Sequence, residues 1–144
     1  MMRDTPRHRL GVSLRKRADM NIFENNDIEI FAHTGEGYER TMHYGEWRVA
    51  FLNYAERFDQ ITYLERHMLT DEVFVLLGGR AKLIVGEDRQ EYPMEPKKLY
   101  NVKRGAWHAV KVSGDAQLLI VENHSTGADN TEYIRFDAPL DITL

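Results

Sequence analysis

The stretch ERHMLTDEVFVLLGG, residues 65–79, decides the fold of this chain. Glu65 and His67 stand two positions apart, so on a strand their side chains lie on the same face. A turn-like pair at 70–71 follows, and then come Glu72 and an apolar run at 73–77. This run is typical of a strand buried on both faces, and the glycine pair at 78–79 allows the positive φ of a hairpin. Titratable side chains therefore flank the strongest core-forming strand, where burial is costly unless each of them has a partner.

Composition bounds the class of protein. With 144 residues, 42% of them hydrophobic, the chain is long enough to bury one core, and no apolar run approaches the roughly twenty residues that span a bilayer. The chain has no cysteine, which excludes disulfides, thiolate metal sites and a cysteine nucleophile and suits a reducing cytoplasm.

Charge divides the chain unevenly. Residues 1–19 carry six of the 19 basic side chains and two of the 23 acidic ones, which leaves 13 basic and 21 acidic side chains in 20–144. We interpret 1–19 as a disordered basic leader with Met20 as the working start; a basic arm for anionic partners is the alternative. The acidic body, with a balance of −8, argues against a nucleic-acid surface.

From residue 20 onward, short apolar stretches alternate with glycine- and aspartate-containing turns. The expected strands are 28–34, 38–44, 47–54, 61–69, 72–77, 80–85, 99–102, 107–112, 117–122 and an edge strand at 133–136. Pro93 and Pro96 mark an irregular stretch, because proline cannot donate to a strand ladder. Helical periodicity is confined to a turn near 55–59. Many short strands with glycine turns predict an all-β sandwich or barrel, in one domain over 20–144.

The spacing in the central stretch resembles the first conserved motif of the cupin superfamily, G-x5-H-x-H-x(3,4)-E-x6-G. His67 takes the place of the second histidine, with four residues between it and Glu72, and six residues separate Glu72 from Gly79. Glu65 stands in the place of the first histidine and Asp59 in that of the leading glycine. The resemblance implies a single-domain, cupin-like double-stranded β-helix, that is, a jelly-roll barrel.

A second cupin motif, G-x5-P-x-G-x2-H-x3-N, is recognisable at 103–108. Gly105 and His108 match it, whereas Lys103 and Val112 stand where proline and asparagine are usual. Together the two motifs cover about residues 47–123. ERHML at 65–69 and RGAWH at 104–108 are also similar to segments of ureidoglycolate lyases, cupin-fold enzymes that release urea from ureidoglycolate. This narrower likeness is a hint at the substrate class.

We expect four side chains to converge inside the barrel, because every second residue of a strand faces its interior. These are His67, Glu72, His108 and Glu65. Two imidazoles with one or two carboxylates suit a divalent ion such as Zn, Mn, Fe or Ni. Glu65 in place of an imidazole favours harder ions and leaves the ion a weaker Lewis acid.

The functional hypothesis is a metal-assisted lyase, hydrolase or isomerase acting on a small oxygenated acid or sugar. Glu65 is expected as the fourth ligand or as the general base. Tyr63 shares its face and is expected to line the cavity as a hydrogen-bond donor. Since no phosphate loop or dinucleotide fingerprint is present, no organic cofactor is expected.

Two alternatives stand beside this hypothesis. If His67 and His108 are ordinary hydrogen-bonded barrel residues and Glu65 pairs with an arginine, the chain is a non-catalytic ligand-binding module or a metal-free structural barrel. The expected partners are a small-molecule ligand and a second copy of the chain, in a homodimer formed through edge strands. Neither a nucleic acid nor a membrane is expected as a partner.

Overall fold

The computed structural model describes residues 20–144, so the expected basic leader at 1–19 lies outside the described residues. The chain divides into two compact units, Met1–Gly35 and Glu36–Leu144. In the described part of the first unit, β1 (Asn21–Glu24) and β2 (Glu29–Phe31) form an antiparallel hairpin. The Asn25 side-chain oxygen accepts hydrogen bonds from the backbone N–H groups of Asp27 and Ile28, which fixes the turn. The expected domain boundary at residue 20 stays a prediction.

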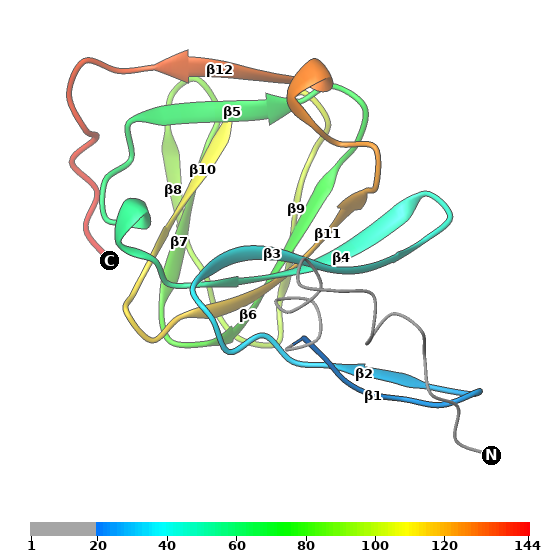
Figure 1. The fold of residues 1–144 in the computed structure, drawn as a ribbon. Helices are drawn as coiled ribbons and strands as arrows, with labels where there is room; N and C mark the ends of the chain where they lie inside the picture. Colours follow the sequence, from blue (N-terminus) through cyan, green and yellow to red (C-terminus); the bar gives the residue numbers. More distant parts are fainter. Residues whose placement is uncertain (1–19) are drawn as a thin grey trace. The chain divides into compact units, whose positions relative to one another are not determined.

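The second unit consists of two five-stranded antiparallel sheets (Figure 1). The first sheet has the order β3-β4-β11-β6-β9, with bounds Gly37–Tyr44, Trp47–Asn53, Gln117–Asn123, Glu72–Gly78 and Leu99–Val102. The second has the order β12-β5-β10-β7-β8, with bounds Thr131–Arg135, Tyr63–His67, His108–Val112, Ala81–Val85 and Gln90–Pro93. Two short 3-10 turns, η3 (Glu56–Phe58) and η4 (Ala128–Asn130), precede β5 and β12. The all-β prediction is therefore confirmed.

The main core lies between the two sheets and follows the two-residue alternation of the strands. In the first sheet, the register sets Leu118 of β11 opposite Leu52 of β4 and Leu76 of β6. These side chains pack in one buried cluster with Leu83 of β7 and Val112 of β10 from the second sheet. The cross-strand pairs thus bring together apolar residues that lie far apart in the chain.

One expectation about β6 is wrong. The run 73–77 was expected to be buried on both faces, but only Phe74 and Leu76 enter the core, while Leu77 is 50% exposed. The reason is that β6 faces the opposite sheet on one side only. The apolar character of Val73, Val75 and Leu77 belongs to the outer face of the first sheet.

The C-terminal segment covers the outer face of the second sheet. A second buried cluster there contains Leu64 and Ile84, and Phe136, Leu140 and Ile142 pack against it. The backbone N–H of Phe136 donates to the carbonyl of Thr62, and that of Leu140 to Ile61. Both faces of the second sheet are therefore covered by apolar side chains.

Strand β8 was not expected, because it ends at Pro93. It lies at the edge of the second sheet, paired only with β7, where a missing N–H donor is tolerated. Among the described residues, no helix has the length and apolar character needed to cross a membrane.

Candidate metal centre in an open cavity

The predicted cluster is assembled from three strands and both sheets. Glu65 and His67 lie on β5, and His108 begins β10 opposite Glu65 in the register. Glu72 begins β6, which belongs to the other sheet. The four residues between His67 and Glu72 therefore carry the chain from one sheet to the other, which brings residues 67 and 72 together across the interior.

This crossover is held by hydrogen bonds on both sides. Asp71 accepts from the Asn101 side chain at 3.0 Å and from the backbone N–H of Arg104 at 2.8 Å. The carbonyl of His67 accepts from the backbone N–H of Gly105 at 2.9 Å, and the Met68 N–H donates to the Asn130 carbonyl. The two ends of the crossover are thus held by hydrogen bonds that do not involve the side chains of the cluster.

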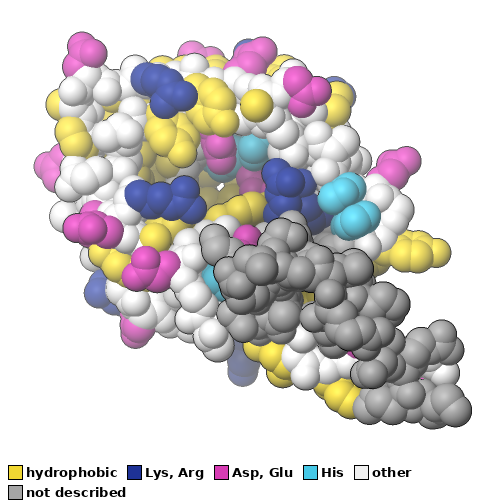
Figure 2. Space-filling model, viewed as in Figure 1, with side chains coloured by type: hydrophobic (Ala, Val, Ile, Leu, Met, Phe, Trp, Pro, Cys, Tyr) yellow, Lys and Arg dark blue, Asp and Glu magenta, His cyan; other side chains and the backbone are white. Residues whose placement is uncertain are grey.

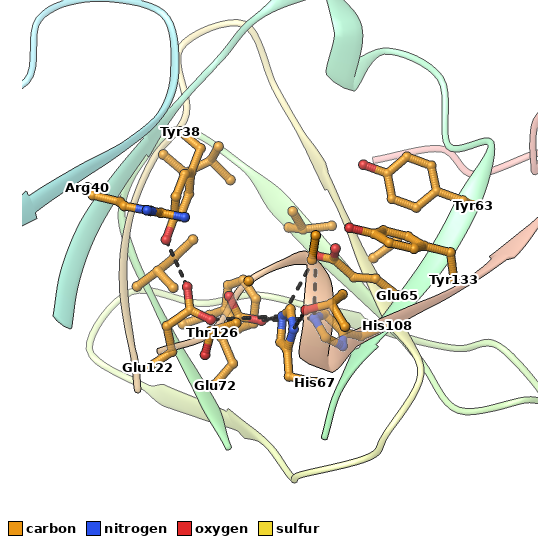
Figure 3. A pocket seen from close by; sticks show the side chains of 18 of the residues that line it. Tyr38, Arg40, Tyr63, Glu65, His67, Glu72, His108, Glu122, Thr126 and Tyr133 are labelled. Carbon is orange, nitrogen blue, oxygen red and sulfur yellow. Dashed lines mark hydrogen bonds and ion pairs between the residues drawn. The ribbon is translucent and has the colours of Figure 1, made fainter. Parts of the chain in front are cut away.

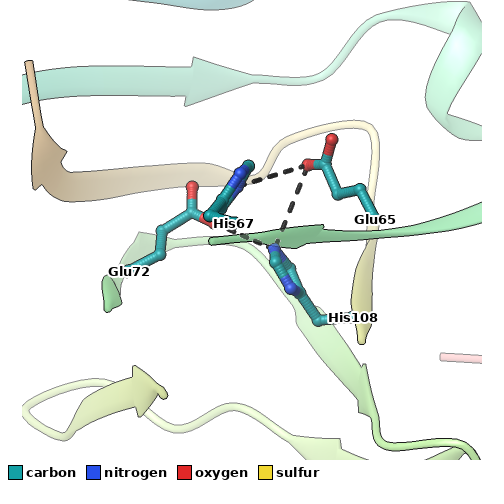
Figure 4. A group of neighbouring side chains, drawn as sticks. All are labelled: Glu65, His67, Glu72 and His108. Atoms are coloured by element: carbon teal, nitrogen blue, oxygen red, sulfur yellow. Dashed lines mark hydrogen bonds and ion pairs between the residues drawn. The ribbon is translucent and has the colours of Figure 1, made fainter. Parts of the chain in front are cut away.

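Both imidazoles converge on one carboxylate oxygen (Figure 4). His67 Nε2 lies 3.0 Å and His108 Nε2 lies 2.9 Å from Glu72 Oε1. Glu65 Oε2 approaches the same two nitrogens at 3.9 and 4.0 Å. One ligand atom from each of the four residues lies within 4.8 Å of the others. The structure therefore brings together all four residues that the sequence predicted as metal ligands.

The far side of each imidazole is also held. His108 Nδ1 lies 3.0 Å from the carbonyl oxygen of Ala106, and His67 Nδ1 lies 3.0 Å from Thr131 Oγ1. Because a carbonyl only accepts, His108 carries its proton on Nδ1, and in a neutral ring Nε2 is left with its lone pair. That lone pair faces an oxygen of Glu72, so a positive charge, either a proton or a metal ion, belongs between the two atoms. Such outer hydrogen bonds are typical of histidines that bind metals.

Electrostatics in the cluster are dominated by burial and by the histidine–carboxylate contacts. Burial alone would raise the pKa of Glu72, but hydrogen bonds from His108 and His67 hold it below its ordinary value. Burial would likewise lower the pKa of each imidazole, but the hydrogen bond with Glu72 raises both. Burial raises the pKa of the Glu65 carboxyl, and the charge of Glu72 raises it further, against the opposing effect of the imidazoles. In the ion-free cluster, Glu72 is therefore the carboxylate that stays ionised.

The donor set fits a divalent cation. Two ring nitrogens and two carboxylates form the mixed N/O set that Zn, Mn, Fe or Ni accepts. His67, Glu72 and His108 are each at most 7% exposed, whereas Glu65 is half-buried beside the opening. Three of the candidate ligands are thus buried and the fourth is partly exposed, an arrangement that leaves room for a small molecule.

The cluster lies in a cavity of about 350 Å³ between the sheets (Figure 3). Tyr63 lines it as expected, and its ring meets that of Tyr133 edge to face at 5.5 Å between centroids. In Figure 3 these two rings stand on one side of the cavity, opposite Tyr38 and Arg40. Figure 2 shows that the hollow opens to the surface, with Asp/Glu and His side chains inside and Lys/Arg side chains around it. The volume suits a small molecule.

Sequence reasoning missed a second polar group in the cavity, formed by Glu122, Arg48 and Tyr38. Glu122 Oε2 accepts from Arg48 at 2.9 Å and from the Tyr38 hydroxyl at 2.8 Å. Glu122 Oε1 is buried without a hydrogen-bond partner among the described residues and lies 3.9 Å from His67 Nε2. Alternation along the strands was the available signal, since it sets Glu122 on the face of Leu118 and Ile120 and Arg48 on the face of Leu52.

Two other sequence features lie away from the cluster. Trp107 points to the opposite face from His108, where it packs against the outer cluster beneath the Arg66 guanidinium, 4.4 Å from the ring centroid. His43 stacks on His124 with centroids 3.6 Å apart. Neither histidine belongs to the candidate metal centre, in agreement with their place outside both motifs.

Solved structures with the same architecture show that the protein has the cupin fold. A cupin-2 domain containing protein from Shewanella frigidimarina superposes with a TM-score of 0.51 at 13% identity, over 83% of this chain and all of that one. A uridine complex of Streptomyces PAC13, described as a nucleoside dehydratase, gives a TM-score of 0.56 at 7% identity, over 69% of this chain and 77% of that one. The cupin expectation is thereby confirmed at the level of the fold. No protein-family model matches the chain, and comparison with curated protein sequences gives no match.

Proposed function

We propose that this protein is a metal-dependent cupin enzyme of the lyase, hydrolase or isomerase class. Its substrate would be a small oxygenated acid or sugar, for which a ureidoglycolate-like molecule is the model. The proposal combines an N/O donor cluster with an open cavity of about 350 Å³. A buried cluster with no access would support only a structural ion.

The observation that carries the proposal is the pair of imidazole nitrogens on one Glu72 oxygen. The hydrogen bond to the Ala106 carbonyl places a proton on His108 Nδ1, so in the neutral ring an Nε2 lone pair faces a carboxylate oxygen at 2.9 Å. His67 makes the equivalent approach at 3.0 Å. Since two acceptors repel at this distance, the arrangement is stable only with a cation between them, and a divalent ion satisfies all the facing atoms at once.

Each residue would have a distinct task. His67, Glu72 and His108 would hold the ion, which when bound would polarise a substrate oxygen or lower the pKa of a water molecule. Glu65, on the open side at 3.9–4.0 Å from the imidazole nitrogens, would serve as fourth ligand or as general base. Tyr63 would donate a hydrogen bond to the substrate from the cavity wall. The apolar wall, which includes Phe74 and Ile120, would exclude water from the reacting end.

The test is turnover by protein purified without added metal. Ureidoglycolate, other small hydroxy acids and sugars would be assayed before chelation, after chelation, and after return of Zn, Mn, Fe or Ni. We expect turnover of at least one substrate that is lost on chelation and restored by one of these ions. Turnover that persists unchanged in chelated, metal-free protein would contradict the proposal.

The same contacts also support a second candidate, a metal-free cavity that binds a small ligand without chemistry. The separations of 2.9 and 3.0 Å are those of charge-assisted hydrogen bonds from two protonated imidazoles to Glu72. In that case the protein purified without added metal would contain no stoichiometric ion. A ligand would then raise its melting temperature without being converted.

A further inference from the structure

Two arginines at the cavity have no carboxylate partner within the part of the chain that the structure describes. Arg40 of β3 and Arg57 of η3 both line the cavity. Among the described residues, no Asp or Glu lies within ion-pair distance of either guanidinium, whereas Arg48 pairs with Glu122 and Arg66 with Glu132. Unpaired arginines beside a cavity are suited to bind anions, because the planar guanidinium matches a carboxylate or phosphate group.

Local structure directs both side chains to this place. Arg40 lies opposite the buried Ala50 of β4, two residues beyond Tyr38 on the same face of β3, and points into the cavity beside Tyr38 (Figure 3). The Arg57 guanidinium lies over the ring of Phe58, 4.7 Å from its centroid, and Phe58 also lines the cavity. A Cβ at position 37 would come within 3.2 Å of Arg57 Nη2, so Gly37 leaves space for this guanidinium.

The formal charges of the lining residues indicate the sign of the charge that a ligand should carry. Three glutamates and three arginines line the cavity, and Glu122 with Arg48 forms a self-neutralising pair. A divalent ion would balance the charges of Glu65 and Glu72. The two guanidinium groups of Arg40 and Arg57 then remain as an uncompensated positive charge at the cavity, in a protein whose net charge is −4.

We propose that the ligand is a small organic acid whose anionic group binds Arg40 and Arg57 while a second oxygen reaches the Glu65–His67–Glu72–His108 cluster. This inference rests on the proposed function and selects an acid over a neutral sugar. The oxyanion is a carboxylate or a phosphate, two groups with the same guanidinium chemistry.

The test compares anions with neutral molecules on metal-loaded protein at low ionic strength. Glycolate, succinate and inorganic phosphate are titrated beside neutral glycolamide and glucose, with binding followed by calorimetry and by melting temperature. We expect one or more of the anions to bind and neither neutral molecule to do so. Arg40→Gln and Arg57→Gln should each weaken the binding of that anion by about tenfold or more. Binding of succinate or glycolate without phosphate would assign a carboxylate, and binding of phosphate would assign a general oxyanion site.

Arg89→Gln is the matched control, since Arg89 carries the same charge but lies over Phe136 outside the cavity lining. The Arg89→Gln protein should bind the anion as tightly as the unsubstituted protein does. The inference is overturned if no anion binds, if the neutral molecules bind equally well, or if both cavity variants retain the parent affinity. Metal content measured on the same samples separates the two proposals. Arginine-dependent anion binding by protein that holds no metal would contradict the proposed enzyme and leave the anion site standing.

Discussion

The two ends of the barrel interior share the same strands but carry opposite chemistry. At one end β11 contributes Leu118 and β4 contributes Leu52, which pack in the apolar cluster. Four residues further along the same faces stand Glu122 and Arg48. On β6 and β10 the inward positions change in the same way, from Leu76 to Glu72 and from Val112 to His108. The apolar end stabilises the fold, and the polar end depends on charge pairing and on what the cavity binds.

The largest expected effect on stability comes from breaking the charge pair of the polar end. Arg48→Met leaves the Glu122 carboxylate buried with only Tyr38 as hydrogen-bond donor, and should lower the free energy of unfolding by about 3–5 kcal/mol. Chemical denaturation measures this change. Arg66→Met is the control, because the Arg66–Glu132 pair is partly exposed and should contribute less than about 1 kcal/mol. Equal losses in the two variants would remove the distinction between buried and surface pairs.

The apolar end should respond to loss of volume. Leu118 is fully buried, so Leu118→Ala should cost about 2–5 kcal/mol of unfolding free energy through lost burial and the cavity that is left. Leu77→Ala, on the outer face of the neighbouring strand where the side chain is 50% exposed, should cost far less. Metal content per folded molecule should be unchanged in both. A Leu118→Ala protein that is no less stable than Leu77→Ala would contradict the assigned core.

The turn that closes the apolar end should also be sensitive. Gly79 has φ +69°, and a Cβ there would approach Ala116 Cα to 2.5 Å. Gly79→Ala should therefore lower the free energy of unfolding by about 1–3 kcal/mol through backbone strain, with a further loss from the close contact. Gly114 lacks both features, and Gly114→Ala is the matched control. We expect thermal unfolding of the Gly114→Ala protein to match that of the parent.

The smallest expected effect is a change in metal affinity that tests whether Glu65, at the polar end, is a metal ligand. Glu65→His supplies a third imidazole at the open side of the cluster, and should tighten Zn or Ni binding by about tenfold, near 1.4 kcal/mol. Competition with a chelator of known affinity measures this. An unchanged affinity would show that Glu65 does not bind the ion directly and would favour its role as general base.

The cluster of Glu65, His67, Glu72 and His108 could be predicted from the sequence because most of its signals are local. Residues 65, 67 and 72 lie within one short stretch, and two-residue alternation with the motif spacing was enough to align them with His108. Alternation also sets Glu122 and Arg48 on inward faces, but their partnership depends on the pairing of β11 with β4, which 63 residues separate along the chain. Arg40 follows Tyr38 by two residues on the same face of β3, opposite Ala50, but the inward direction of that face is set only by the pairing of β3 with β4. The β6 error has the same origin, because an apolar run does not tell whether its second face is covered.

The central claim, that the polar end is a metal centre, is tested most directly by elemental analysis of purified protein. We expect about one divalent ion per chain in the parent protein and in His43→Ala, since His43 stacks on His124 away from the cluster. His67→Ala and His108→Ala should remain folded and contain no stoichiometric metal. Full metal content in both of these variants, or none in the parent after exposure to Zn, Mn, Fe and Ni, would contradict the account.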